Sequence, residues 1–266
     1  MTSRLLMPCR TASVARLGRP QHAEPADAAA AVEGSTLPTR ILDWRHPRVT
    51  GLTSRVQQTR PASPLDALRT AHGIIAREVR PVYSVDDRRR ASRTLALGRG
   101  SCSQRMAVLE AVARASGVAT RVRGLLVDGS FWYPRFPRLK TLVPERVLLA
   151  WPEFGVDGGW VPIGELFSDM RTGAASAGFT NKGGETLFDA VARTGLRWDG
   201  PLSCGAQGDS CDLSARVRVD LGHFDDRDSL FERHGPTLCL PARTLGEPVL
   251  GRWSAGAQAA SGPRRP

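Results

Sequence analysis

The sequence predicts an α+β domain in which a helix that begins at a cysteine packs against an antiparallel sheet. Apolar residues recur at helical spacing between residues 64 and 116. From residue 118 onward they alternate with polar residues at the period of two that is typical of strands. A glycine-rich turn over residues 98–101 separates two of the predicted helices and places Cys102 at the start of the second.

The first predicted helix runs from residue 64 to near Pro81, with Ser63 as its N-cap. A short helical segment over residues 85–97 leads into the glycine turn, and the next helix runs from 102 to 116. The first turn of a helix carries unpaired N–H groups and the positive end of the dipole, which stabilise a thiolate. Cys102 is therefore a candidate nucleophile.

The segment after this helix changes from helical to strand periodicity. Residues 118–127 read as a strand, and residues 145–154 and 160–163 read as an antiparallel hairpin joined by the turn 156–159. An aromatic and proline-rich loop is expected over residues 131–137. Further along, residues 185–192 are expected to be helical, and residues 217–235 are expected to wrap the edge of the domain.

Composition divides the chain into three parts. Residues 1–61 are rich in Ala, Pro, Gly, Thr and Arg, so we expect a mostly disordered extension, either a leader or the result of a misplaced start. Residues 62–240 are expected to form the domain, and residues 241–266 a flexible tail. With 266 residues and 41% hydrophobic content, the chain is long enough for one domain with a proper core.

Charge and cysteine content exclude several classes of function. The net charge of +11 rests almost entirely on arginine, without long basic runs or interleaved aromatics, so we expect no nucleic-acid partner. No apolar run approaches the roughly 18 to 20 residues that span a membrane, so no membrane partner is expected. The cysteines lack the spacing of a disulfide framework or zinc site, and no phosphate-binding glycine motif occurs. We therefore expect no metal, no cofactor and a cytoplasmic location.

The order of these elements resembles the transglutaminase-like superfamily over about residues 64–167. The matching motifs are Gly100-Ser-Cys102, Arg114-Ala-Ser-Gly117 followed by Arg121, Leu149-Ala-Trp151, and Gly158-Gly-Trp160. The resemblance implies a papain-like α+β fold and thiol acyl transfer. In that chemistry a cysteine attacks an amide or thioester carbonyl, a histidine shuttles the proton, and an acidic or amide residue orients the histidine.

Two of the three catalytic positions that the resemblance implies are substituted in this chain. Cys102 matches the nucleophile, but the histidine position falls on Leu149 and the aspartate position on Gly164. The neighbouring Glu165 could supply a carboxylate in place of Gly164. Another histidine could supply the base, and the candidate is His223, which is followed closely by Asp225 and Asp226. The alternative interpretation is that His223 is a solvated surface residue.

Aromatic residues could line a substrate groove beside the cysteine. The candidates are Trp132, Tyr133 and Trp151, although aromatic residues on a sheet more often belong to the core.

Two functional hypotheses follow. In one, the domain is an atypical cysteine acyltransferase, amidase or peptidase that acts through Cys102 on a peptide, protein or small-molecule amide, for example in a biosynthetic pathway. In the other, it is a catalytically silent domain that binds a peptide or protein partner. The substitutions at Leu149 and Gly164 favour the silent domain, whereas the retained Cys102 favours the enzyme. The sequence leaves the oligomeric state open.

Overall fold

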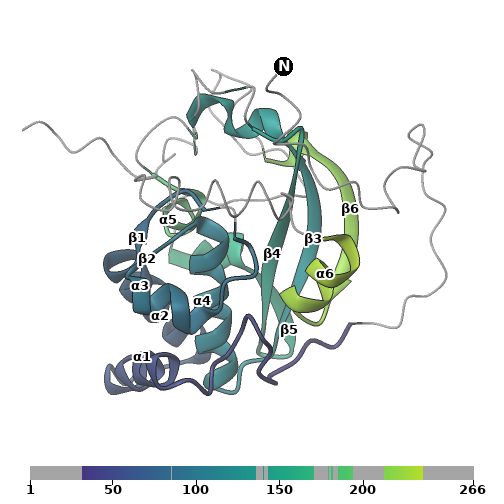
Figure 1. Cartoon of the computed structure of the whole chain (residues 1–266). Coiled ribbons are helices and arrows are strands. Elements are labelled where there is room, and N and C mark those ends of the chain that lie inside the picture. The colour runs from purple at the N-terminus through teal and green to yellow at the C-terminus, as the bar shows by residue number, and fades with distance from the viewer. Residues whose placement is uncertain are drawn as a thin grey trace, which may run out of the picture.

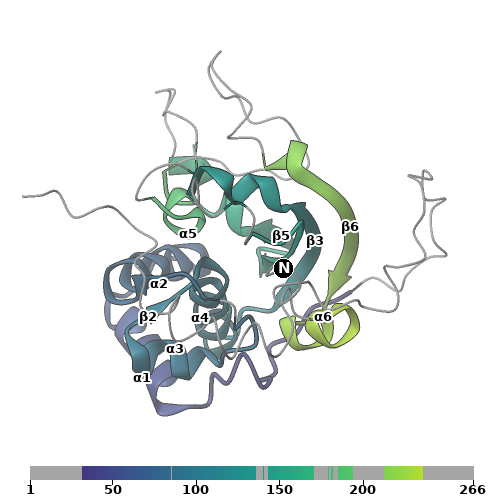
Figure 2. The ribbon, with the colours of Figure 1, turned by 45° about the horizontal axis from the view of Figure 1, so that its top comes forward.

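The computed structural model describes residues 32–84, 86–135, 140, 143–170, 179, 181, 185–193 and 213–235. In both ribbon views a group of helices lies on one side of a curled four-stranded antiparallel sheet (Figures 1 and 2). The predicted α+β class, with a helix that starts at Cys102 and packs on an antiparallel sheet, is confirmed.

Four helices form the helical side of the domain: α1 (Pro47–Gln58), α2 (Pro64–Glu78), α3 (Ala91–Leu97) and α4 (Cys102–Ala115). Helix α4 is central, because it contacts the other three helices and also strands β3 and β4 of the sheet. Every residue from Gln104 to Arg114 is buried. The helix that carries Cys102 is thus held from all sides along most of its length.

Helix α1 lies where a disordered extension was expected, and this corrects the prediction for the end of residues 1–61. Its buried residues Val49, Leu52 and Val56 pack into the core, and Pro47 stands at the first helical position. The stretch is rich in Thr, Arg and Gln and has only three buried apolar residues. Its composition therefore favoured disorder over a helix. Residues 1–31 lie outside the described residues.

The sheet has the strand order β5-β4-β3-β6, and all neighbours are antiparallel. Its strands are β3 (Thr120–Asp128), β4 (Arg146–Val156), β5 (Gly159–Pro162) and β6 (Val217–Phe224). The predicted hairpin is confirmed as β4 and β5, with positive φ angles of 51° and 77° at Asp157 and Gly158. The segment expected to wrap the edge is β6 followed by α6 (Arg227–His234) (Figure 2).

Several boundaries differ from the sequence prediction. The segment expected to be helical from residue 85 becomes helical only at Ala91, and residues 129–135 of the expected loop region form a 3₁₀ helix. The helix expected over 185–192 is α5 (Leu187–Ala190). The parallel pair β1 (Arg80–Pro81) and β2 (Arg99–Gly100) was not predicted, because strands of two residues have no periodicity to detect. Further 3₁₀ turns are Ile163–Glu165, Ser168–Met170 and Ser214–Arg216.

Charged side chains contribute to the core. Arg105 and Arg227 are 0% exposed and pair with Asp189 at 2.7 Å and with Glu110 at 2.5 Å, respectively. Arg114 donates to the Thr120 hydroxyl at 2.7 Å, and burial lowers its pKa. Because a buried charge is costly unless it is paired, these contacts fix how α4 sits against α5, α6 and β3.

Candidate functional site

The start of α4 is built by a reciprocal capping arrangement. The Ser101 hydroxyl accepts from the Gln104 backbone N–H at 3.3 Å, and the Gln104 side-chain oxygen accepts from the Ser101 N–H at 3.0 Å. Ser101 is therefore the N-cap, and Cys102 is the first helical residue rather than the cap. A Cβ at Gly100 would stand 2.7 Å from the Thr94 side chain, so this turn requires a glycine.

A loop between β1 and α3 holds the same turn from outside. The Gln104 side-chain amide donates to the Ser84 hydroxyl at 2.7 Å and to the Asp86 carbonyl at 2.8 Å, and Arg89 donates to Gln104 Oε1 at 2.9 Å. Cys102 itself is half-buried and packs against the core. Within the described ranges, no side chain forms a hydrogen bond with its sulfur.

Arg227 connects the start of α4 to the strand on which the histidine was sought. Its NH1 group donates to Ser103 Oγ at 2.9 Å, and its NH2 group donates to the Ala150 carbonyl at 3.3 Å. Ser103 follows Cys102 in the chain, and Ala150 follows Leu149. One guanidinium thus joins the residues that follow the two positions paired by the family resemblance. Sequence reasoning missed Arg227, because nothing in its local pattern marks it.

Leu149 and Gly164, the two positions predicted to be substituted, lie in the packed interior. Leu149 is 6% exposed and belongs to the core, where its register partner on β3 is Leu125. Gly164 is buried in the 3₁₀ turn that follows β5. A leucine and a glycine offer neither a base nor a carboxylate there.

His223 is placed by β6 rather than on a surface turn. It stands beside Arg123 of β3, and its Nε2 atom lies 3.3 Å from Glu153 Oε1. Glu153 is 4% exposed and also accepts from Arg121 Nε at 2.7 Å. The carboxylate that orients His223 is therefore Glu153, not the neighbouring aspartates, and Asp226 instead caps α6.

The other described histidines have structural partners. His46 caps α1 through its Nδ1 atom. His72 is 2% exposed, with its Nε2 atom 2.7 Å from the Phe188 carbonyl and its ring stacked on Phe188, and burial lowers its pKa. His234 packs edge-on against Phe224. Among the described residues, no histidine is hydrogen-bonded to Cys102.

The aromatic residues expected in a groove are distributed differently. Trp151 is 0% exposed and belongs to the core, which corrects its prediction as a groove residue. Trp132 is half-buried and packs edge-on against Phe131, with 4.9 Å between ring centroids. Tyr133 is exposed.

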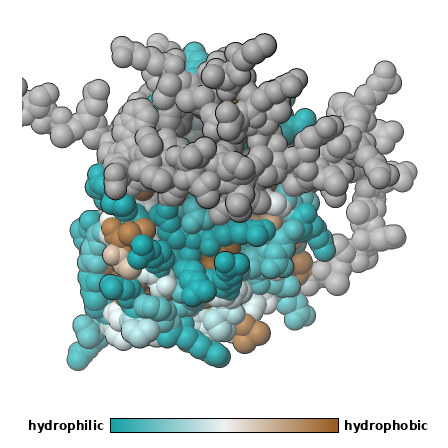
Figure 3. Space-filling model, in the orientation of Figure 1, coloured by the Kyte–Doolittle hydropathy of each residue, from teal (hydrophilic) through white to brown (hydrophobic). Residues whose placement is uncertain are grey.

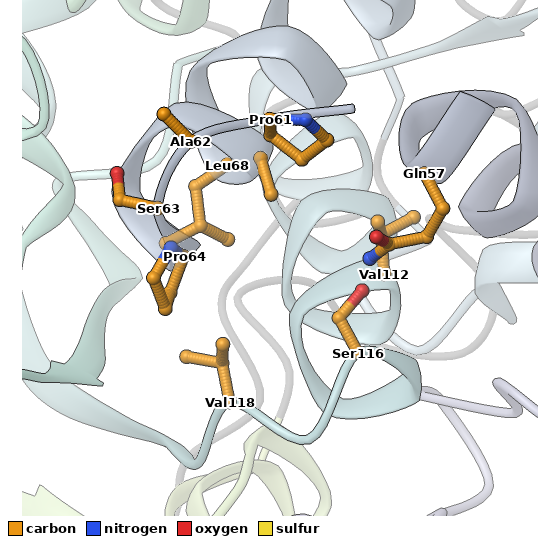
Figure 4. A pocket seen from close by; sticks show the side chains of 10 residues that line it. Gln57, Pro61, Ala62, Ser63, Pro64, Leu68, Val112, Ser116 and Val118 are labelled. Atoms are coloured by element: carbon orange, nitrogen blue, oxygen red, sulfur yellow. The ribbon is translucent and has the colours of Figure 1, made fainter. Parts of the chain in front are cut away.

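A pocket of about 260 Å³ opens at the opposite end of α4 (Figure 4). Gln57 and Ser116 point into it from one side, and Pro64 and Leu68 line the other. With a rise of about 1.5 Å per residue, Ser116 lies roughly 20 Å along the helix from Cys102. The pocket is therefore separate from the cysteine turn.

No helix in the described ranges is long and apolar enough to cross a bilayer. In the same ranges, no three histidine, cysteine, aspartate or glutamate side chains gather as metal ligands.

Comparison with known proteins gives one match. The family model of the transglutaminase-like superfamily matches residues 50–164, from α1 to the turn after β5. No curated protein and no solved structure matches the chain.

Proposed function

Because residues 50–164 match the model of the transglutaminase-like superfamily, we propose that this domain is catalytically silent and binds a peptide or protein partner. The contacts of Arg227 carry this proposal. A guanidinium with no solvent exposure donates to Ser103 in the first turn of α4 and to Ala150 of β4, the residues next to Cys102 and next to the family's histidine position. An arginine does not act as a base, since it stays protonated.

The substituted positions support the same conclusion. A thiolate mechanism needs a base within hydrogen-bond reach of the sulfur and a group that orients that base. Leu149 and Gly164 supply neither, and the hydrogen bonding of His223 is with Glu153. The histidine and carboxylate of this pair are held on the sheet by β6 and β4, so they form a unit of their own.

The experiment is alkylation of Cys102 by iodoacetamide as a function of pH, read at the Cys102 peptide by mass spectrometry. Reading one peptide separates Cys102 from Cys9, Cys204, Cys211 and Cys239, which lie outside the described residues. We expect the rate to follow the pH profile of glutathione measured alongside. A profile displaced to lower pH would show an activated thiolate and would overturn the proposal.

A second candidate function is cysteine-dependent acyl transfer, and the observation that favours it is the placement of Cys102. The thiol is half-buried rather than enclosed, and it stands at the first position of a firmly capped helix. Hydrolysis of p-nitrophenyl acetate by the chain and by its Cys102→Ser variant separates the two candidates. Equal rates support the silent domain, whereas loss of the rate in the variant supports acyl transfer.

A reducing cytoplasm is the proposed compartment. Cys102 is a free thiol in the structure, and reduced thiols persist where glutathione and thioredoxin act.

A further inference from the structure

The positive charge of the chain is concentrated in one stretch. Residues 40–100 contain thirteen arginines and five acidic residues, a net charge of +8 out of the +11 of the whole chain. This stretch forms α1, α2, α3 and the β1–β2 pair, which are the elements on the helical side of the domain (Figure 1). The charge is therefore localised in space as well as in sequence.

Ten of these arginines form no ion pair with a carboxylate of the described residues, and we call six of the ten the basic face. Five are exposed and one, Arg99, is half-buried. The basic face consists of Arg45, Arg48, Arg80, Arg90, Arg93 and Arg99.

Four of the five acidic residues of the same stretch, all except Asp87, have partners outside the basic face. Glu78 pairs with Arg55, Asp66 with Arg69, and Asp86 with Arg89. Asp43 accepts from the Ser92 backbone at 3.0 Å and from its hydroxyl at 2.5 Å. The carboxylates of Asp43, Asp66, Glu78 and Asp86 are therefore not ion partners of the basic face.

Backbone contacts bring the basic face together. The Ala91 N–H donates to the Ile41 carbonyl at 2.8 Å, so the start of α3, with Arg90 and Arg93, lies beside the segment that leads into α1. Helix α3 then ends at Gly98 and continues directly into Arg99 of β2. In both ribbon views α1 and α3 lie together on the far side of α4 from the sheet (Figures 1 and 2).

Two features of the basic face destabilise the folded chain when no ligand is bound. Arg80 and Arg99 are direct register partners in the parallel pair, and like charges opposite one another on neighbouring strands are destabilising. Arg48 stands in the first turn of α1, which has no acidic residue, so its charge adds to the positive end of the helix dipole. A bound anion would relieve both.

The occupant is another molecule rather than a segment of this chain. Outside the described ranges the sequence has six acidic residues against twelve basic ones, and no two of the acidic residues are adjacent. The exposed large hydrophobic residues of the described part are Leu37, Tyr133 and Met170, so no exposed aromatic belongs to the basic face. Single-stranded nucleic acids bind through such stacking aromatics, which leaves a polypeptide as the favoured anion. Figure 3 shows a largely hydrophilic surface with separate hydrophobic residues.

We propose that the basic face docks an acidic polypeptide segment, whose carboxylates lie over α1 and α3 and reach Arg80 and Arg99 beside the Cys102 turn. Arginine suits this role because its planar guanidinium binds carboxylates through two parallel hydrogen bonds. The inference rests on the proposed binding function and adds the chemical class of the partner.

The test is fluorescence anisotropy of the full chain with a labelled peptide of about 16 residues, half of them Asp or Glu, at about 0.15 M salt. The variant is Arg80→Gln with Arg99→Gln. The matched control is Arg146→Gln with Arg233→Gln, which removes the same charge from exposed positions on β4 and α6. We expect affinity to fall at least about tenfold in the variant and to stay within about twofold in the control.

Three results would overturn the inference: no binding by the unmodified chain, equal losses in the variant and the control, or tighter binding of an oligothymidine of equal charge. Circular dichroism of each variant confirms that it folds. Because anisotropy reports binding without turnover, these outcomes are independent of Cys102. An activated thiol would end the silent-domain proposal and leave the docking result in place.

Discussion

Glu110 of α4 and Arg227 of α6 form an ion pair, with 2.5 Å between Oε1 and Nε, in which neither side chain is exposed. The remaining donors of Arg227 reach Ser103 and the Ala150 carbonyl, so one guanidinium ties together α4, α6 and β4. Burial raises the pKa of the Glu110 carboxyl, and the positive charge of Arg227 reduces this increase. Removing one member of this pair should therefore lower the free energy of unfolding substantially.

Replacing Arg227 by methionine is expected to lower the free energy of unfolding by about 3 to 5 kcal/mol, because it leaves Glu110 buried without its partner. The double variant Arg227→Met, Glu110→Leu should regain most of that loss, since no uncompensated charge remains. Urea denaturation measures both. The control is Arg218→Met, whose side chain is 60% exposed and pairs with Asp128, with an expected cost below about 1 kcal/mol. A double variant as unstable as the single one would contradict the explanation.

Acid is expected to destabilise the fold through His72. Burial lowers its folded-state pKa, so below about pH 6.5 the unfolded chain binds a proton that the folded chain excludes. The contribution of His72 to the free energy of unfolding should therefore decrease as the pH falls from about 7 to 5, by up to about 1.4 kcal/mol per pH unit. His234, with its pKa also lowered by burial, acts in the same direction.

His72→Gln should flatten this pH dependence, because glutamine keeps a donor for the Phe188 carbonyl but does not titrate. Urea denaturation at several pH values measures the slope. His46→Gln, at an exposed position before α1, is the control and should keep the slope of the unmodified chain. If His72→Gln leaves the slope unchanged, the acid sensitivity has another source.

Gly124 and Gly51 are expected to respond in opposite directions to alanine. A Cβ at Gly124 would lie 2.7 Å from the buried Leu230 side chain and 3.2 Å from Phe224, so Gly124→Ala should cost about 1 to 3 kcal/mol. A Cβ at Gly51 in α1 meets nothing within 4 Å, so Gly51→Ala should stabilise by up to about 1 kcal/mol. Thermal unfolding of both variants tests these two predictions. A stabilised Gly124→Ala variant would contradict the first one, because it would show that α6 can shift away from the added Cβ at little cost.

The cap of α4 should contribute measurable stability. Ser101→Ala removes the acceptor of the Gln104 N–H and is expected to cost about 0.5 to 2 kcal/mol. Ser54→Ala, at an exposed position inside α1, should change stability by less than about 0.5 kcal/mol. Similar values for the two variants in chemical denaturation would mean that the loop contacts of Gln104 hold the turn without the cap.

The parts of the fold that follow from local periodicity could be predicted. Helix α2 begins at Pro64 after the Ser63 cap, as expected, and α4 and the β4–β5 hairpin match the predicted ranges closely. Their apolar residues repeat within one element, so a short window of sequence contains the signal. Helix α1 was missed because its three apolar positions lie in a polar, proline-flanked stretch.

The site could be predicted only in part, because its decisive contacts join distant residues. Arg227 and Glu110 are 117 positions apart, and His223 and Glu153 are 70 apart. A charged side chain in sequence gives no sign that it will be buried, since burial depends on the partner that another element brings. The placement of Cys102 at a helix start was local and was therefore predictable.

The distance along the chain between Glu110 and Arg227 also sets an order of events during synthesis. A domain generally folds as a unit during or after synthesis, and α4 leaves the ribosome well before α6. Until Arg227 emerges, α4 carries a carboxylate that lacks its ion partner, and Gly124 lacks the cover of Leu230. The ion pair that holds the Cys102 helix to α6 and β4 is therefore complete only once the last described helix has been made.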